Sequence, residues 1–232
     1  AEYQTNNGLA GGSAMLSGNH KGFYWLGRIS HKQAKNYRDR VDGWVYGTNY
    51  RETDASASLG LNRGWGYSHL DLTLFDDLQA IPDGSRASAS RRFTKQIPED
   101  DETRVIVPYS ELNTSSLPVL HQHVQHYRVY SMNHLDLGEG GLDLNVGFER
   151  SVRREYSHPE AGSVPGLDLH VNTYTYGLRY QAPELQGWNI TAGLNGMYQI
   201  NTSTNGTEFI IPNYHELDLG PFAMAKKTRD CP

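Results

Sequence analysis

Hydrophobic and polar residues alternate over long parts of this chain, and the clearest case lies near its middle. Between Leu142 and Phe148 every second residue is apolar, and the residues between them are polar or glycine. A period of two is typical of an extended strand with one apolar and one polar face. The preceding GEGG at 138–141 supplies glycines that accept a positive φ in a tight reversal. The pattern therefore predicts a long β-hairpin over residues 127–156.

The same alternation recurs along the chain and predicts about nine strands, most of them 10 to 15 residues long. The predicted strands cover residues 11–16, 23–34, 54–63, 67–80, 119–137, 142–156, 167–181, 188–202 and 217–226. We expect these strands to form one antiparallel up-and-down sheet, because the connections between them alternate in length. Short turns begin at Ser17, Gly64, Gly138 and Ala182, and long loops begin at Lys35, Ile81, Ser157 and Ser203.

In an up-and-down meander every second connection lies at the same end of the sheet. One end should therefore carry tight turns and the other extended loops, as in outer-membrane β-barrels. The longest connection, 81–118, holds four prolines, which argue against central strands. A connection of this length is usually functional or disordered.

A soluble antiparallel sheet also alternates, with one packed face and one wet face. Its strands usually run about 5–6 residues, however, and its apolar face needs a second layer. No amphipathic helix or second class of strand supplies such a layer here. The pattern favours an all-β fold, an antiparallel up-and-down transmembrane β-barrel of which this chain forms a part. A soluble β-rich binding module remains an alternative.

The parity of each strand predicts which side chains share a face, because a slip of one residue would exchange the two faces. The residues expected to face lipid are Leu70, Leu72, Leu74, Leu142, Leu144, Val146, Phe148, Tyr174, Tyr176, Leu178, Ile190 and Leu194. The residues expected to face the lumen are Asp71, Thr73, Asp143, Asn145, Thr175, Arg179, Asn189 and Asn195.

Composition narrows the function classes. The chain has 232 residues, a net charge of −5 and a pI of about 6.1, so a nucleic-acid footprint is not expected. No run approaches the ~18 apolar residues of a transmembrane helix, whereas a transmembrane strand needs only ~9–11 residues. The sole cysteine, Cys231, excludes an internal disulfide and a thiolate metal cluster. The first residues, AEYQTNNG, do not have the pattern of a signal peptide.

Three stretches carry a resemblance to a known family: YQTNNG at 3–8, the segment 61–86, and GTEFIIPNYHELDLGPF at 206–222. The chain resembles the barrel portion of TonB-dependent outer-membrane receptors of the iron-complex or siderophore type. The resemblance implies that residues 1–226 are a segment of a 22-stranded barrel in the outer membrane of a Gram-negative bacterium. It further implies uptake of a scarce ligand such as a ferric siderophore. The partners would be the lipid bilayer and TonB, the latter acting through a plug domain.

Two features depart from that family. No plug domain or TonB box is recognisable, and the closing strand with its terminal aromatic residue is missing. Residues 227–232 break the alternation, and we interpret them as a tail outside the family pattern, from a truncation or frame shift. A segment of a passive porin-type barrel is the alternative within the membrane class.

Candidate chemistry is sparse. No G-x-S-x-G nucleophile motif or phosphate-binding glycine motif occurs, so we expect neither an enzyme nor a cofactor. His121 and His123 are weak candidates for metal ligands, because imidazoles two residues apart on a strand share a face. The alternative is that they are solvated residues at the polar end of a strand. The basic residues Arg86, Arg91, Arg92 and Lys95 of the long loop are candidates for capturing an anionic ligand. The acidic residues at 99–102 would partly cancel that field.

Overall fold

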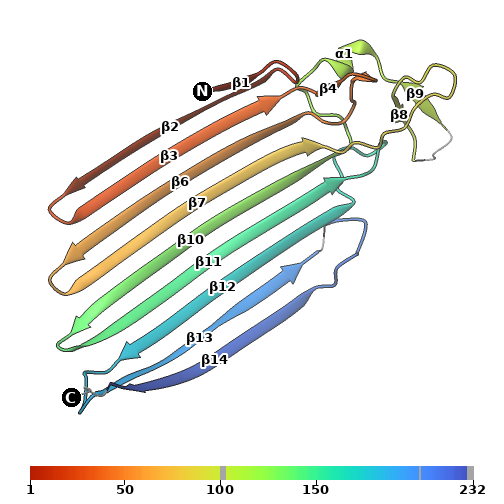
Figure 1. Cartoon of the computed structure of the whole chain (residues 1–232). Helices are drawn as coiled ribbons and strands as arrows, with labels where there is room; N and C mark the ends of the chain where they lie inside the picture. Colours follow the sequence, from red (N-terminus) through yellow and green to blue (C-terminus); the bar gives the residue numbers. More distant parts are fainter. Residues whose placement is uncertain (100–102, 204, 229–232) are drawn as a thin grey trace.

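One antiparallel sheet of ten strands forms the body of the molecule, as seen in the computed structural model, which describes residues 1–99, 103–203 and 205–228 (Figure 1). Each strand pairs with the strand next along the sheet, so the predicted all-β, antiparallel, up-and-down architecture is confirmed. The sheet is open, with β1 and β14 at its two margins. Its strands are β1 Glu2–Gln4, β2 Leu9–His20, β3 Phe23–Ala34, β6 Tyr50–Arg63, β7 Gly66–Ala80, β10 His121–Leu137, β11 Gly140–Tyr156, β12 Leu167–Gln181, β13 Trp188–Thr202 and β14 Tyr214–Lys227.

Several strand boundaries differ from the sequence prediction by a few residues, since β6 begins at Tyr50 and β14 at Tyr214, and two differences are larger. The short strand β1 was missed because three residues are too few to show an alternation. The predicted turn at Ser17 is wrong, because the stretch from Ser17 to His20 continues β2 and pairs with β3. The reversal is confined to Lys21 and Gly22, whose φ angles of 48° and 77° fit a two-residue hairpin turn.

The two ends of the sheet differ as predicted. Tight connections at 21–22, 64–65, 138–139 and 182–187 lie together at one end in Figure 1. The long connections at 35–49, 81–120, 157–166 and 203–213 lie at the other end. The loops contain the small elements β4 Arg38–Asp39, β5 Gly43–Trp44, β8 Thr94–Gln96, β9 Arg104–Ile106 and α1 Tyr109–Leu112.

The strand registers divide the side chains into an apolar face and a polar face. One row of cross-strand partners on the apolar face is Leu16, Gly27, Ala57, Leu72, Val129, Phe148, Tyr174, Tyr198 and Leu217. The adjacent row on the polar face is Met15, Arg28, Ser56, Thr73, Arg128, Glu149, Thr173, Gln199 and Glu216. The two sets of residues predicted from parity lie on opposite faces of the sheet. What each face contacts stays a prediction.

Large side chains on the apolar face are exposed, among them Leu16 (71 %), Val146 (43 %) and Leu217 (69 %). In the described part of the chain, no second layer covers this face. The buried apolar side chains are Leu9, Ala34, Ala80, Phe93, Val107, Val152 and Leu167, which lie in the long loops or where the strands meet them. Among the described residues no helix is long and apolar enough to cross a membrane.

The polar face is organised by hydrogen bonds and by rings packed over glycines. Ser58 donates to Asp71 (2.5 Å) and Arg179 donates to Asp143 (2.7 Å), in each case across neighbouring strands. The ring of Tyr24 lies over Gly60, where a Cβ atom would be 1.7 Å from the ring. Packing of this kind favours one register between the paired strands, and the ring covers the backbone of a glycine that has no side chain of its own.

Candidate functional site

The loop cap, which we define as residues 35–49 together with the described residues of 81–120, is the candidate functional site. It lies at the long-loop end of β3, β6, β7 and β10 (Figure 1). The segment 81–118 was predicted to be irregular. It instead contains the paired strands β8 and β9 and the single helical turn α1.

Two buried asparagines hold the two parts of the loop cap together. Asn36 Oδ1 accepts a hydrogen bond from the Thr48 N–H (2.8 Å), and Asn36 Nδ2 donates to the carbonyl of Leu112 (2.9 Å). Asn49 Nδ2 donates to the carbonyl of Ser116 (2.8 Å). Each asparagine is only 1 % exposed. Leu112 lies 76 residues from Asn36 and Ser116 lies 67 residues from Asn49, so these two bonds fix the fold of the long loop from outside it.

Ion pairs add to these links. The guanidinium of Arg86 donates two hydrogen bonds to the Asp42 carboxylate (2.7 and 2.5 Å), and it also stacks 4.0 Å over the ring of Phe93. Lys95 Nζ donates to both carboxylate oxygens of Glu111 (2.6 and 2.7 Å). Two-point contacts fix the geometry of a charged pair more firmly than a single contact does.

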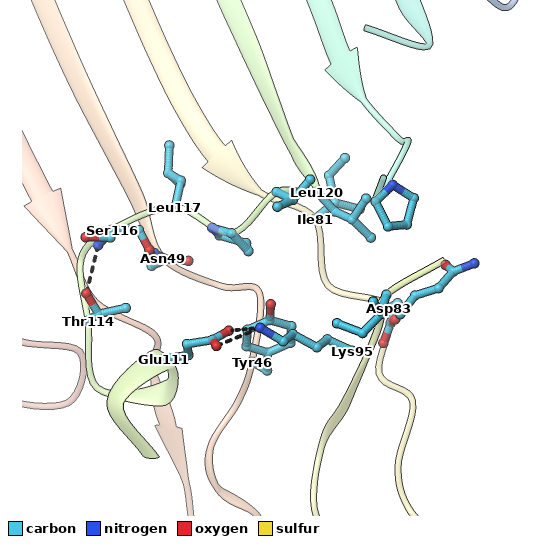
Figure 2. Close-up of a pocket in the computed structure, with 15 residues that line it drawn as sticks. Tyr46, Asn49, Ile81, Asp83, Lys95, Glu111, Thr114, Ser116, Leu117 and Leu120 are labelled. Carbon is cyan, nitrogen blue, oxygen red and sulfur yellow. Dashed lines mark hydrogen bonds and ion pairs between the residues drawn. The ribbon is translucent and has the colours of Figure 1, made fainter. Parts of the chain in front are cut away.

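A cavity of about 310 Å³ is lined mainly by the loop cap, together with Pro159 of the loop after β11. Its apolar lining includes Ile81, Ile97, Leu117, Val119 and Leu120, and its polar lining includes Tyr46, Asn49, Asp83, Lys95 and Glu111. Figure 2 shows lining side chains from separate parts of the sequence around one common space, among them Tyr46, Ile81, Lys95, Glu111 and Leu120. A concave and mainly apolar site with a few polar groups is the usual form of a small-molecule site.

Two polar groups in the cavity have unusual environments. Burial raises the pKa of Tyr46, the nearby carboxylates of Glu111 and Asp83 act in the same direction, and the three effects together bring it to about 12. The phenol of Tyr46 therefore stays protonated at neutral pH. The Asn49 Oδ1 atom is buried and has no hydrogen-bond partner among the residues that the structure describes. A buried amide oxygen without a partner is costly unless a ligand or water supplies a donor.

The four basic residues predicted to capture an anion have two different environments. Arg86 and Lys95 are engaged in the ion pairs with Asp42 and Glu111. Arg91 and Arg92 are exposed on the connection before β8. Capture of an anion by this loop stays a prediction, and Arg91 and Arg92 are its better candidates.

The acidic stretch that was expected to weaken the positive field is only partly described. Glu99 Oε1 lies 2.8 Å from His158 Nδ1 of the loop after β11. Asp100, Asp101 and Glu102 lie outside the described residues, as does Cys231.

His121 and His123 share a face, as the parity predicts, but their rings meet different partners. His121 Nδ1 lies 2.8 Å from the Val119 carbonyl, and its ring stacks on Tyr156 with centroids 4.5 Å apart. His123 Nε2 lies 3.1 Å from Asp76 Oδ2. Within the described residues no group of three or more His, Cys, Asp or Glu side chains is arranged to hold a metal ion.

Sequence reasoning missed Tyr46, Asn49 and Glu111 as site residues. Tyr46 and Asn49 lie in a polar connection with no motif, and Glu111 is one acidic residue among many. The only sequence signal for this site was the length of the 81–118 loop, because the contacts that form the cavity join distant segments. Comparison with protein-family models, with curated proteins and with solved structures gave no match.

Proposed function

We propose that this chain is part of the wall of an outer-membrane β-barrel that takes up a scarce ligand, in the manner of a TonB-dependent receptor. One observation carries the proposal: the apolar row from Leu16 to Leu217 runs across nine strands and is not covered by a second layer in the described residues. Apolar side chains in such a row gain most from a lipid environment. Apart from β1, the strands of the sheet are 12 to 17 residues long, which exceeds the ~9–11 residues that a tilted strand needs to cross a bilayer.

The limits of the apolar band support the same proposal. Toward the long loops the apolar face becomes polar at a row that includes Thr53, Asp76, Gln125 and His170. Tyrosines such as Tyr127 and Tyr174 lie on the band near this limit, and Trp188 lies on the same face near the tight turns. Aromatic side chains at both borders of an apolar band are typical of outer-membrane barrels.

The uptake part of the proposal is supported by the loop cap. Long loops point outward in barrels of this type, so a cavity within them meets the ligand first. A ferric siderophore is the ligand class that the family resemblance suggests. The energy would come from TonB through a plug domain in another part of the receptor.

Two alternatives lead to different experimental results. A passive porin-type segment would conduct solutes without TonB, so uptake would not respond to loss of TonB. A soluble binding module is favoured by one observation, the ordered loop cap with its internal cavity. Such a module would expose both faces of the sheet to water or to another protein.

Spin labels on adjacent residues of β7 test the membrane assignment. Cysteine replaces Leu72 in one variant and Thr73 in another, with Cys231→Ser in both, and the labelled proteins are placed in lipid vesicles. We expect oxygen, which concentrates in lipid, to reach the label at position 72 and a water-soluble nickel complex to reach the label at 73. Strong contact with the nickel complex at both positions would rule out the membrane barrel and favour the soluble module.

A further inference from the structure

The walls of the cavity define the chemistry of a ligand. Ile81, Leu117 and Leu120 supply apolar contacts to the cavity. Ile97 and Val119 also line it, and they keep 46 % and 47 % of their surface exposed. A mainly apolar molecule would cover these exposed side chains and gain hydrophobic stabilisation. The volume of about 310 Å³ is at the lower end of the range for ligand pockets, so the ligand is small.

Asn49 supplies a directional group in this apolar space. Its Nδ2 atom is held by the Ser116 carbonyl (2.8 Å), which fixes the amide and leaves Oδ1 as its free acceptor. Among the described residues this buried Oδ1 has no partner. A ligand with an N–H or O–H group would remove the cost of that unpaired oxygen.

The charges in the wall disfavour an anion. Lys95 is the one cation among the described lining residues, and both oxygens of Glu111 already accept hydrogen bonds from it. The wall also contains Asp83, whose carboxylate pairs with Arg104 outside the lining. An anion entering the cavity would approach two carboxylates and would have to compete with Glu111 for Lys95.

We propose that the loop cap binds a small, neutral and mainly apolar molecule that donates a hydrogen bond to Asn49 Oδ1. This site is separate from the exposed pair Arg91 and Arg92, so an anionic iron complex and the neutral molecule would occupy different parts of the same loop. This inference rests on the proposed uptake function in one respect only, namely that the ligand reaches the loop cap from outside the cell.

Three related probes test the recognition of Asn49 without changing the protein. Indole is neutral, apolar and an N–H donor, 1-methylindole lacks the donor, and indole-3-carboxylate carries a negative charge. Binding is followed by NMR of isoleucine methyl groups in the full chain in detergent micelles. The methyl groups of Ile81 and Ile97 report on the cavity, and that of Ile190 on the sheet reports partition of the probes into detergent.

We expect indole to shift the Ile81 and Ile97 signals in a saturable way, and 1-methylindole to bind about tenfold more weakly because it leaves Asn49 Oδ1 unpaired. Indole-3-carboxylate should also bind more weakly than indole. Equal affinities for indole and 1-methylindole would overturn the role of Asn49. Tighter binding of the carboxylate would overturn the preference for a neutral ligand.

A cavity-filling variant locates the site. Leu117→Trp should abolish the saturable shifts by occupying the space, whereas Ile106→Trp, on the same loop but outside the lining, should leave them unchanged. Shifts that persist in Leu117→Trp would place the binding elsewhere and refute the proposal. Because the spin-label experiment reports on lipid contact and this one on the loop cap, either proposal can fail while the other stands.

Discussion

The sheet and the loop cap are stabilised in different ways. In the sheet the backbone ladder and a period of two place every side chain, and large apolar residues such as Leu16 and Val146 remain exposed. In the loop cap the order comes from side chains, because Asn36, Asn49 and Phe93 are buried there. The sheet therefore depends on what surrounds its apolar face, whereas the loop cap depends on its own internal partners.

The largest effect should follow from a charge on the apolar face. Val146→Arg places a guanidinium in the middle of the apolar band, and we expect a loss of about 2–4 kcal/mol in unfolding free energy in a bilayer. The matched variant Asn145→Arg lies on the polar face and should change stability by about 0.5 kcal/mol or less. Urea unfolding in lipid vesicles, followed by tryptophan fluorescence, measures both. Equal losses for the two variants would contradict the difference between the faces.

A substitution at the tight turn between β6 and β7 tests how closely the backbones of the sheet approach one another. Gly66, at the start of β7, has a φ of +129°, and a Cβ atom there would lie 2.0 Å from the carbonyl oxygen of His134. Gly66→Ala should therefore destabilise the β6–β7–β10 region by about 1–3 kcal/mol. Gly64→Ala in the same turn is the control, since nothing lies within 4 Å of its Cβ position. If Gly64→Ala loses as much stability as Gly66→Ala, the loss comes from any substitution in the turn and not from the close contact with His134.

Loss of a buried asparagine should loosen the loop cap and leave the sheet intact. Asn36→Ala removes the partners of the Thr48 N–H and the Leu112 carbonyl, at a cost of about 1–3 kcal/mol. We expect amide hydrogens of the loop cap to exchange faster while those of β10 and β11 keep their protection. Replacing the exposed Asn19 by Ala should change neither. Faster exchange throughout the sheet would show that the cap and the sheet unfold together.

Under the proposed function, the basic residues of the long loop should divide into two pairs in an uptake assay with the full-length protein. Arg91→Ser with Arg92→Ser should lower uptake of a labelled ferric siderophore at low salt and less at high salt, since salt screens exposed charges. Arg86→Ser with Lys95→Ser should act mainly by loosening the loop cap, so its effect should depend little on salt. A plug-deleted receptor supplies the background. Normal uptake with all four residues replaced would remove electrostatic capture from the proposed function.

The smallest effect concerns pH and Tyr46. Its pKa is raised to about 12, above the ordinary value of 10, so the folded state favours the protonated phenol. The resulting stabilisation of the loop cap is fully present below pH 10 and is lost as the pH rises from 10 to 12. The difference in tyrosinate absorbance between the unmodified protein and Tyr46→Phe should titrate near pH 12. A midpoint near pH 10 would contradict the buried environment of Tyr46.

The long strands were predictable because their alternation is local. Each of the nine long strands was found from the sequence, and the parity of Leu142 and Asp143 correctly assigned them to opposite faces. The misplaced turn at Ser17 has a physical reason: small and polar residues such as Gly18 and Asn19 resemble a turn in sequence, yet they pair in β2 with Trp25 and Tyr24. The pattern of side chains alone does not reveal that the backbone at these residues pairs with the next strand.

The loop cap was hardly predictable for the opposite reason. The hydrogen bond from Asn49 to Ser116 spans 67 residues, and the Lys95–Glu111 ion pair joins β8 to α1. Contacts of this kind join residues far apart in the sequence, so no local alternation of side chains predicts them. For the same reason the sequence groups Arg86 and Lys95 with Arg91 and Arg92 as candidates for capturing an anion, although Asp42 and Glu111 pair with the first two.

The strict sequence order of the ten strands has a consequence for how the molecule forms. Each strand from β2 to β13 pairs only with its predecessor and successor in the sheet, so assembly needs mainly short-range loop closures. A hairpin formed anywhere offers its open margin as a template for the next strand, and the sheet can grow by successive addition. The connection from β7 to β10 is the slowest closure in this scheme, because it is the longest. The asparagine contacts that order this connection would then form after the strands on both sides are in place.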